Sequence, residues 1–415
     1  MLAMLVSKNK SDLIIIGAGL VGTSLAVSMQ NHGLQIKILE HHLPDATLSL
    51  KEKDMRPITL SHASYQILRT LGVWEDLASE SCPISIVHVS NQGALGTVCF
   101  RASELQVPAL GYVVPFYKLQ NALYQRVASQ KNVEIIPITK VLAIRCGNVA
   151  SVNYLTTEGE KNLQTSLLVA ADGTESTARR LLNISIKEKN ENGVALIASM
   201  DLRKPHNQTA YERFTPQGTL SVLPLFNQNQ CRLVWSLSRK LADNVSRWPD
   251  EEFQYKVQEI FKNRLGEIKS LKRDSQFPLQ LLISKEQIRP GFVLLGNAAH
   301  TLYPIAAQGF NLGLRDVAVL NELVVSAYQR HNSLGEISLL QEYIKWRKED
   351  QKQIIRLTQN ISQWVSLPLP LANRVRGLVL LAIELLPPIK NQLAKRFLGL
   401  TGRLSKLMRG KLEWM

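Results

Sequence analysis

Hydrophobic positions follow a strand-like pattern through most of the chain and a helix-like pattern near its end. Residues 12–33 predict a strand, a tight glycine turn and a helix, because the apolar, largely β-branched run Leu13–Ile16 is followed by apolar residues at helical spacing. A second strand is predicted to end at Glu40. Further strands are predicted over residues 84–90, 133–138, 167–173, 218–225, 231–238 and 292–299.

The same pattern predicts helices and a change of sheet. Residues 61–71 predict a helix, with Ser61 as its N-cap, apolar residues at helical spacing and Gly72 as its stop. Residues 193–237 contain strands that alternate or are separated by turns, which predicts a separate antiparallel sheet. The chain is therefore expected to leave its first sheet and return to it. After residue 308 the pattern is mostly helical.

Composition limits the class of protein that these elements can build. With 415 residues, 45% of them apolar and 20% charged, the chain is long enough for two intertwined domains and too apolar to be disordered. Its four cysteines are scattered, without paired spacing or neighbouring histidines, so we expect neither a metal site nor a disulfide framework. The apolar start reaches Lys8 too soon for a secretory signal, so we expect a cytoplasmic protein.

Positive charge is concentrated at the C-terminal end. The formal net charge is +15, but no nucleic-acid motif accompanies it, so we expect no nucleic-acid partner. From residue 373 onward nine basic residues outnumber two acids, which leaves this segment at +7. The nine are Arg374, Arg376, Lys390, Lys395, Arg396, Arg403, Lys406, Arg409 and Lys411.

The proline-broken segment from Leu367 onward carries these charges around the apolar run Leu378–Leu386. That run is far below the ~20 apolar residues that span a bilayer. Two interpretations stay open: a peripheral contact with the inner face of a membrane, or a helix pair that completes the fold or docks a partner subunit.

The first motif with chemical meaning is the glycine turn after the first strand, which contains Gly17, Gly19 and Gly22. Gly17 permits the tight turn, Gly19 lets the backbone approach a pyrophosphate, and Gly22 lets the helix pack on the strand. The helix N-terminus offers N–H groups to the phosphates, and Glu40 can accept hydrogen bonds from ribose hydroxyls. The motif predicts a bound dinucleotide but does not choose between NAD and FAD.

Two further segments make that choice. One is a strand that ends in the turn Asp172-Gly173, with Arg179 downstream; the other runs from Gly296-Asn297 into residues 308–316. With these three segments in this order, the sequence resembles flavoprotein aromatic hydroxylases of the para-hydroxybenzoate hydroxylase type. The resemblance extends over nearly the whole chain and includes residues 54–56, 111–114 and 211–214. Within that family it is most similar to the ubiquinone-biosynthesis hydroxylases, and among these to the 2-polyprenyl-6-methoxyphenol hydroxylases.

The pattern and the resemblance together imply a mixed α/β and α+β fold. A Rossmann-like FAD-binding domain, over residues 1–75, 108–182 and 276–335, is expected to interleave with an antiparallel-sheet substrate domain. The substrate domain is expected over residues 76–107 and 183–275, and a helical, basic C-terminal segment over residues 336–415.

The resemblance also implies a reaction. FAD, bound non-covalently and reduced by NAD(P)H or another transient reductant, would react with O2 to form a C4a-hydroperoxide that hydroxylates the ring of a polyprenylated phenol. Other flavoprotein activities stay open, namely an epoxidase or a reductase. A non-catalytic subunit of a quinone-biosynthesis complex is a further alternative, and other subunits of such a complex are candidate partners.

The resemblance assigns roles residue by residue. Cofactor binding falls to Gly17, Gly19, Gly22, Glu40, Arg56, Asp172, Gly173, Gly296, Asn297, Gly309, Phe310 and Asn311. Pro304, Gly309 and Phe310 are assigned to the reacting face of the flavin. Backbone N–H groups of residues 309–311, at a helix N-terminus, would stabilise negative charge on the reduced ring.

Several positions depart from the family pattern. Asn297 replaces the commoner aspartate but keeps an amide oxygen that can accept a hydrogen bond. Tyr303 stands where relatives often have histidine, and Ala307 where they usually have glycine. Residues 115–117 read Pro-Phe-Tyr where many relatives have Glu-Asn-Arg.

For three residues the sequence leaves two interpretations open. Tyr117 either replaces an arginine contact to the flavin or packs in the core. His300 either makes a structural hydrogen bond or transfers a proton. Arg56 either reaches the flavin phosphates or is a solvated loop cation.

Overall fold

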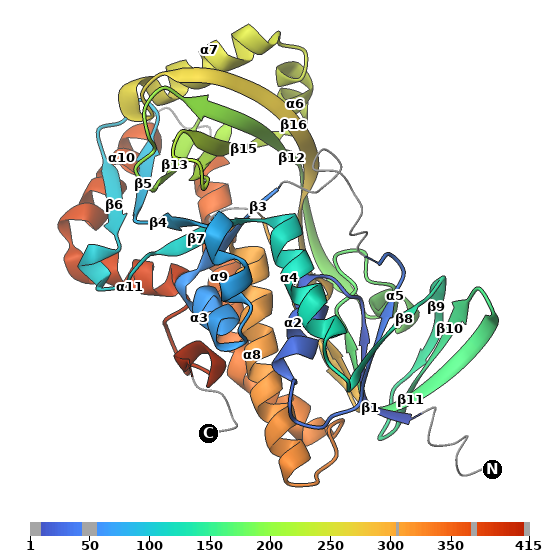
Figure 1. The fold of residues 1–415 in the computed structure, drawn as a ribbon. Coiled ribbons are helices and arrows are strands. Elements are labelled where there is room, and N and C mark those ends of the chain that lie inside the picture. Colours follow the sequence, from blue (N-terminus) through green and yellow to red (C-terminus); the bar gives the residue numbers. More distant parts are fainter. Residues whose placement is uncertain (1–9, 44–55, 304–306, 367–371, 411–415) are drawn as a thin grey trace, which may run out of the picture.

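The computed structural model describes residues 10–43, 56–303, 307–366 and 372–410 of the chain. Within these residues, strands build two large sheets and one small sheet, and long helices of the C-terminal part pack against them (Figure 1). This arrangement confirms the predicted mixed α/β and α+β fold with a helical C-terminus.

The first large sheet has the predicted first strand at its centre. Its strands are β1 (Lys10–Ile16), β2 (Ile36–Glu40), β8 (Val133–Pro137), β9 (Lys140–Arg145), β10 (Ala150–Thr156), β11 (Gly159–Ala170), β17 (Ile288–Arg289) and β18 (Phe292–Leu294). They lie in the order β17-β18-β11-β1-β2-β8, and antiparallel β10 and β9 extend from β11. Because β1 pairs in parallel with both β11 and β2 and is covered on both faces, Leu13, Ile14 and Ile15 are completely buried.

The second large sheet is mainly antiparallel. Its strands are β5 (Ile86–Asn91), β6 (Thr97–Arg101), β12 (Ile186–Leu202), β13 (Thr209–Thr215), β14 (Gly218–Pro224), β15 (Gln230–Ser238), β16 (Ile268–Ser284) and β19 (His300–Thr301), in the order β19-β16-β12-β15-β14-β13-β5-β6. The antiparallel pairing of β12 to β15 confirms the prediction for residues 193–237. β5 pairs in parallel with β13, which the pattern did not predict, because no hairpin joins these strands and fixes their direction.

The third sheet is small and adjoins the predicted helix over residues 61–71. It consists of β3 (Pro57–Ser61), β4 (Cys82–Ile84) and β7 (Gly111–Pro115), with β7 in the middle. The helix α3 (His62–Thr70) follows β3 directly. Its caps are those predicted, because Ser61 Oγ accepts a hydrogen bond from Ser64 N (3.3 Å) and Gly72 follows with a φ of +71°.

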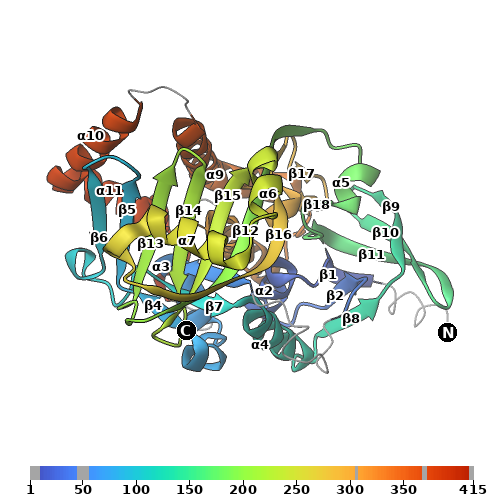
Figure 2. The same ribbon diagram turned by 90° about the horizontal axis from the view of Figure 1, so that it is seen from above.

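The remaining helices divide between the two large sheets. They are α2 (Leu20–Ser28), α4 (Phe116–Ala128), α5 (Thr177–Leu181), α6 (Arg239–Val245), α7 (Asp250–Phe261), α8 (Gln308–Gln329), α9 (Ile337–Ser366), α10 (Ala372–Leu385) and α11 (Pro387–Phe397). α2, α4 and α8 share a hydrophobic core with the first sheet, whereas α6 and α7 cover one face of the second (Figure 2). The other face of the second sheet lines a cavity.

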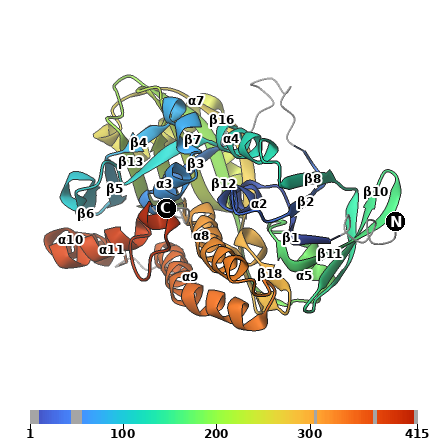
Figure 3. The same ribbon diagram turned by 60° about the horizontal axis from the view of Figure 1, so that its bottom comes forward.

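The C-terminal helices α10 and α11 pack at the edge of the second sheet, beside β5 and β6 (Figures 2 and 3). Gly96 and Gly377 approach so closely that a Cβ on Gly96 would lie 1.7 Å from the Gly377 carbonyl oxygen. Glu384 Oε2 accepts a hydrogen bond from Cys99 N (2.9 Å), and Glu384 Oε1 lies 3.0 Å from Lys390 Nζ. These contacts make the two helices an integral part of the fold.

Not all of the positive charge in this segment is available to a partner. Lys390 and Arg376 are buried, and Lys390 also lies 3.0 Å from Glu104. In the described part of the chain, no single helix is both long and apolar enough to cross a membrane. α10 and α11 meet that requirement only as a pair, and this pair is bent by 96°.

Candidate active site

The glycine turn lies where β1 ends and α2 begins. Gly17 has a φ of +101°, and a Cβ there would lie 2.6 Å from Ala171 O. A Cβ on Gly22 would lie 2.0 Å from Gly17 O, so both glycines are required for the backbone to pack. Gly19 differs, because a Cβ on it would meet nothing within 4 Å. Its open side faces a cavity, at the N-terminus of α2.

Glu40, at the end of β2, closes this turn from the neighbouring strand. Its carboxylate accepts hydrogen bonds from Ala18 N and from His42 N, the latter at 2.8 Å. The acid predicted to face a ribose is thereby held beside the glycine turn. Glu40 itself does not line the cavity.

The other two predicted segments meet the glycine turn at one edge of the sheet. The Asp172-Gly173 turn follows β11 and Gly296 follows β18, and these parallel strands end at the same edge as β1. Arg179, to which the sequence assigned no role, ties the two segments together. Its Nη1 donates to Ala298 O (2.9 Å) and its Nη2 to Thr174 O (2.6 Å).

A cavity of about 1050 Å³ lies between this edge and the second sheet. Of the predicted site residues, those that line it are Gly19, Arg56, Gly173, Asn297, Gly309, Phe310 and Asn311. Gly17, Gly22, Glu40, Asp172 and Gly296 do not line it. They shape the backbone around it, as Gly296 does with a φ of +59° and with a Cβ position only 2.9 Å from Val21 Cγ2. Pro304 lies outside the described residues.

The N-terminus of α8 opens into the same cavity. Gly309 and Phe310 lie in its first turn, and Ala307 before it has a φ of +49°, in the left-handed region. That conformation favours glycine, which is the residue of the family pattern at this position, and the structure does not explain the alanine. Asn311 holds the helix in place: its Nδ2 donates to Thr59 O (2.8 Å), and its Oδ1 accepts from Ser61 N (2.8 Å).

Two of the ambiguous side chains take clear positions. The Arg56 guanidinium lies over the rings of Phe116 (5.1 Å) and Phe277 (4.5 Å) and lines the cavity, so it is not simply a solvated cation. Tyr117 does not line this cavity; its hydroxyl donates to Glu80 Oε2 (3.1 Å). Phe116, next to it, contributes to the wall instead.

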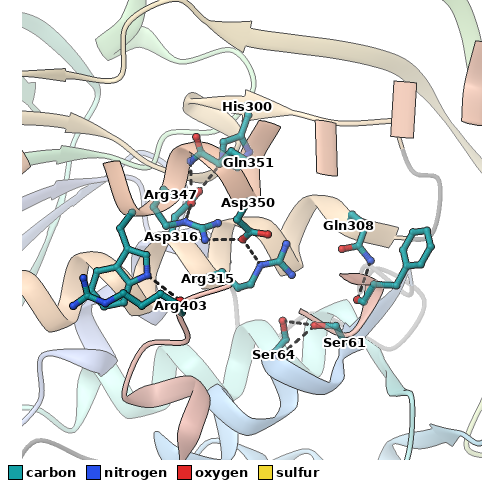
Figure 4. Close-up of polar contacts among 12 residues, drawn as sticks. Ser61, Ser64, His300, Gln308, Arg315, Asp316, Arg347, Asp350, Gln351 and Arg403 are labelled. Carbon is teal, nitrogen blue, oxygen red and sulfur yellow. Dashed lines mark hydrogen bonds and ion pairs between the residues drawn. The ribbon is translucent and has the colours of Figure 1, made fainter. Parts of the chain in front are cut away.

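His300, on β19, belongs to a buried ion cluster with residues of α8 and α9 (Figure 4). Its Nε2 lies 2.5 Å from Asp316 Oδ2, and both side chains are fully buried. Asp316 Oδ1 accepts from Arg347 Nε (2.6 Å) and Gln351 Nε2 (3.0 Å), while Arg347 also pairs with Asp350 (2.6 Å). This setting supports the structural interpretation of His300, because its partner is a buried carboxylate rather than the cavity.

The model of the FAD binding domain family matches residues 10–358. The chain belongs to this FAD-binding family. The 3-demethoxyubiquinol 3-hydroxylase of Escherichia coli is 28% identical over 95% of this chain and 100% of its own length. The uncharacterized protein slr1300 of Synechocystis is 30% identical over 98% and 97%, respectively.

A solved structure shares the whole fold of this FAD-binding protein. The p-nitrophenol 4-monooxygenase PnpA from Pseudomonas putida superposes with a TM-score of 0.76 at 17% identity, covering 95% of this chain and 99% of its own. The family resemblance predicted from the three motifs is therefore confirmed, and FAD is the cofactor.

The residues present fit FAD. Gly19 leaves open space beside the N–H groups of the first turn of α2, as a pyrophosphate requires. Asp172 Oδ2 accepts from Ala178 N (3.0 Å), whereas its buried Oδ1 has no hydrogen-bond partner among the described residues. Gly173, the next residue, lines the cavity, and a Cβ on it would meet nothing within 4 Å, so the backbone of this turn has room for the cofactor.

Proposed function

We propose that this protein is an FAD-dependent monooxygenase that hydroxylates the aromatic ring of a polyprenylated phenol in ubiquinone biosynthesis. The proposal is carried by one cavity, which joins the flavin-binding segments to an apolar wall of the second sheet. The names of the relatives agree, since the E. coli protein is a demethoxyubiquinol hydroxylase and that of Rhodospirillum rubrum a ubiquinone hydroxylase.

An apolar arm of the cavity suits the prenyl chain. Beyond the sheet, the lining continues over α9, α10 and α11 with Leu357, Ile361, Leu380, Ile383, Leu393 and Phe397. Burying hydrocarbon against such a surface stabilises the complex by about 25 cal/mol per Å² of buried apolar area. A long isoprenoid tail is the part of the substrate that supplies this area.

The site residues assigned by resemblance form part of the proposal. Bound FAD, reduced by NAD(P)H or another donor, supplies the oxygen chemistry, and the protein positions the substrate and excludes water. The first turn of α8, with the N–H groups of Gly309 and Phe310, offers its positive end to negative charge on the reduced ring. Arg56 supplies a positive charge on the cavity wall.

An isotope experiment tests the reaction. The FAD-loaded protein is supplied with a prenylated methoxyphenol, NADPH and 18O2, and one labelled oxygen is expected in the ring of the product. Label from water would exclude a monooxygenase. An epoxidised side chain or a reduced product would point to the related flavoprotein activities, and protein without flavin to a non-catalytic subunit.

The domain boundaries also stay a proposal. We assign residues 1–75, 108–182 and 276–335 to the FAD-binding domain and residues 76–107 and 183–275 to the substrate domain. The interleaving of the two large sheets along the chain supports the alternation of the domains, but β16 and β19 of the second sheet extend beyond residue 275 into the segment assigned to the FAD-binding domain. Other subunits of a quinone-biosynthesis complex are proposed partners.

We propose further that α10 and α11 rest on the inner face of an anionic membrane. Their outer surface exposes a series of apolar side chains, which we call the elbow surface: Val375, Leu378, Val379, Leu381, Leu385, Leu386 and Ile389. Arg374 and Lys395, also exposed on these helices, add positive charge. Because the inner surface of the same helices lines the apolar arm, a prenylated substrate would pass from lipid into the cavity over a short path.

A further inference from the structure

Glu212 brings a carboxyl group to an otherwise mainly apolar wall of the cavity. On β13, Ala210, Glu212 and Phe214 share the face that lines the cavity, because side chains alternate along a strand. In register across the sheet, Glu212 lies between Val89 on β5 and Ser221 on β14. The wall around this pair includes Val87, Val98, Phe100, Leu223 and Val234.

The carboxyl group of Glu212 is only half satisfied. Ser221 Oγ donates a hydrogen bond to Oε2 (2.6 Å). Oε1 is buried and has no hydrogen-bond partner among the described residues. Because buried polar atoms are nearly always paired, an unpaired acceptor in the wall of a cavity points to a donor on the ligand.

The surroundings favour the protonated form of this carboxyl group. Burial raises the pKa of Glu212 to about 7, against the opposing effect of the Ser221 hydrogen bond. On the opposite face of the sheet, the ring of His88 of β5 packs at a tilt of 45° against that of Tyr211, and Arg213 donates to Ile260 O (2.6 Å). Two other charged side chains that line the cavity, Arg56 and Glu175, come from outside this sheet.

We infer that Glu212 contacts the phenol hydroxyl of the substrate through Oε1 and accepts its proton. This inference rests on the proposed function and names the residue that prepares the ring for attack. The proton moves from the phenol oxygen to Oε1 and leaves its electron pair on the oxygen, which makes the ring electron-rich. When the ring regains aromaticity, its hydroxylated carbon loses a proton to water and Glu212 returns its own to the phenol oxygen.

Ser221 is the positioning residue for this step. Its hydrogen bond fixes Oε2 and stabilises the carboxylate, so Oε1 is the oxygen of this cavity-lining residue that is left to accept from a ligand. The two residues therefore have separable effects: Glu212 provides the proton acceptor, and Ser221 sets its orientation and pKa.

The test uses FAD-loaded protein and a methoxyphenol with a short prenyl chain. In the unaltered protein, kcat/KM is expected to rise with pH through about 7, the pKa of the Glu212 carboxyl. Glu212→Gln is expected to remove this rise and to lower product formation roughly 100-fold. Ser221→Ala should keep the rise but shift it to higher pH, because it removes a hydrogen bond to the carboxylate.

The protonation state of Glu212 can also be followed without turnover. Infrared spectra of the unaltered protein and of Glu212→Gln are recorded, and their difference isolates the Glu212 carboxyl group. The band of the protonated carboxyl group should disappear near pH 7 and shift when the phenol binds. A Glu212→Gln protein with unchanged flavin content, rate and pH profile would overturn this inference alone, as would a carboxyl band that the phenol does not affect. Failure of the unaltered protein to label any phenol with 18O2 would instead overturn the proposed function.

Discussion

Gly19 and Gly22 belong to one turn but satisfy different requirements. Gly22 is needed by the protein itself, since a Cβ there would lie 2.0 Å from Gly17 O. Gly19 has room for a side chain and an ordinary φ of −68°, so its missing side chain serves what lies in the cavity. Gly22 is therefore required for folding, and Gly19 for cofactor binding.

At Gly19 we therefore expect a binding defect without a folding defect. Gly19→Val should leave the stability of the FAD-free protein within about 0.5 kcal/mol of the unaltered protein, because its side chain enters open space. It should weaken FAD binding by at least about tenfold, or about 1.4 kcal/mol, because it occupies the path of the pyrophosphate. Flavin fluorescence titration and urea denaturation measure the two effects.

The matched variant is Gly22→Ala, for which the order of effects should reverse. Its methyl group collides with Gly17 O, so the protein itself should lose stability before FAD is added. A folded Gly19→Val protein that retains full flavin would contradict the assignment of this turn to the pyrophosphate.

At the scale of elements, α8 joins the cavity to the buried ion cluster. Its first turn carries Gly309 and Phe310, and further along it Asp316 pairs with His300 and Arg347 (Figure 4). Burial acts to raise the pKa of Asp316, but Arg347 and His300 outweigh burial and hold that pKa well below its usual range. The cluster thus fixes α8 against α9 and holds its N-terminus at the cavity.

Removing one charge from this cluster should destabilise the folded protein. Asp316→Asn leaves the buried Arg347 without one of its two carboxylate partners and should lower the free energy of unfolding by about 3–5 kcal/mol at pH 7. Because the Asp316 pKa is depressed, its contribution is present above the unfolded pKa of about 3.9 and is lost as pH falls further. The difference between variant and unaltered protein should therefore shrink in acid.

Urea denaturation of the FAD-loaded proteins measures this effect. Asp250→Asn is the control, because its partner Arg273 forms a pair in which Asp250 is 68% exposed and which should contribute at most about 1 kcal/mol. Equal losses in the two variants would mean that the cluster does not determine the stability of α8.

At the scale of the whole molecule, the elbow surface and the cavity lie on two sides of the same helices. Leu380 and Ile383 of α10 line the cavity, while Leu378 and Leu385 are 65% and 68% exposed. A helix that is apolar on both surfaces needs a second apolar contact, and exposed patches of this kind mark interaction sites. A bilayer satisfies this need and also delivers a substrate that is insoluble in water.

Vesicle binding tests this proposal. The binding constant for phosphatidylglycerol vesicles, measured by sedimentation, should fall roughly thirtyfold in Arg374→Gln/Lys395→Gln, because each basic residue contributes about 1 kcal/mol at an anionic surface. Leu378→Gln/Leu385→Gln should also weaken binding, and added salt should weaken the charge-dependent part. Flavin content should not change in either variant.

The control for the elbow surface is Val149→Gln, since Val149 is 54% exposed in the turn between β9 and β10, far from α10 and α11 (Figure 1). It should sediment like the unaltered protein. If the unaltered protein does not bind vesicles at low salt, the elbow surface docks a partner subunit instead.

The sequence by itself determined the family, the cofactor and the order of the main elements. Gly17, Gly22 and Ser61 could be interpreted from their neighbours, because a tight turn, a close helix contact and an N-cap are local requirements on the backbone. Alternation along residues 193–237 likewise predicted the second sheet, since a strand with one covered face repeats every second residue.

Only the tertiary structure decided what depends on contacts between distant residues. Glu212 is one of 34 acidic residues in the sequence, and its difference from the others lies in burial beside Ser221 in a cavity wall. Arg179 joins two segments through a hydrogen bond to a distant carbonyl oxygen, and Lys390 forms ion pairs with two glutamates. No local pattern identifies these partners. Burial and pairing belong to the folded chain, because they arise when strands and helices from separate parts of the sequence enclose the same space.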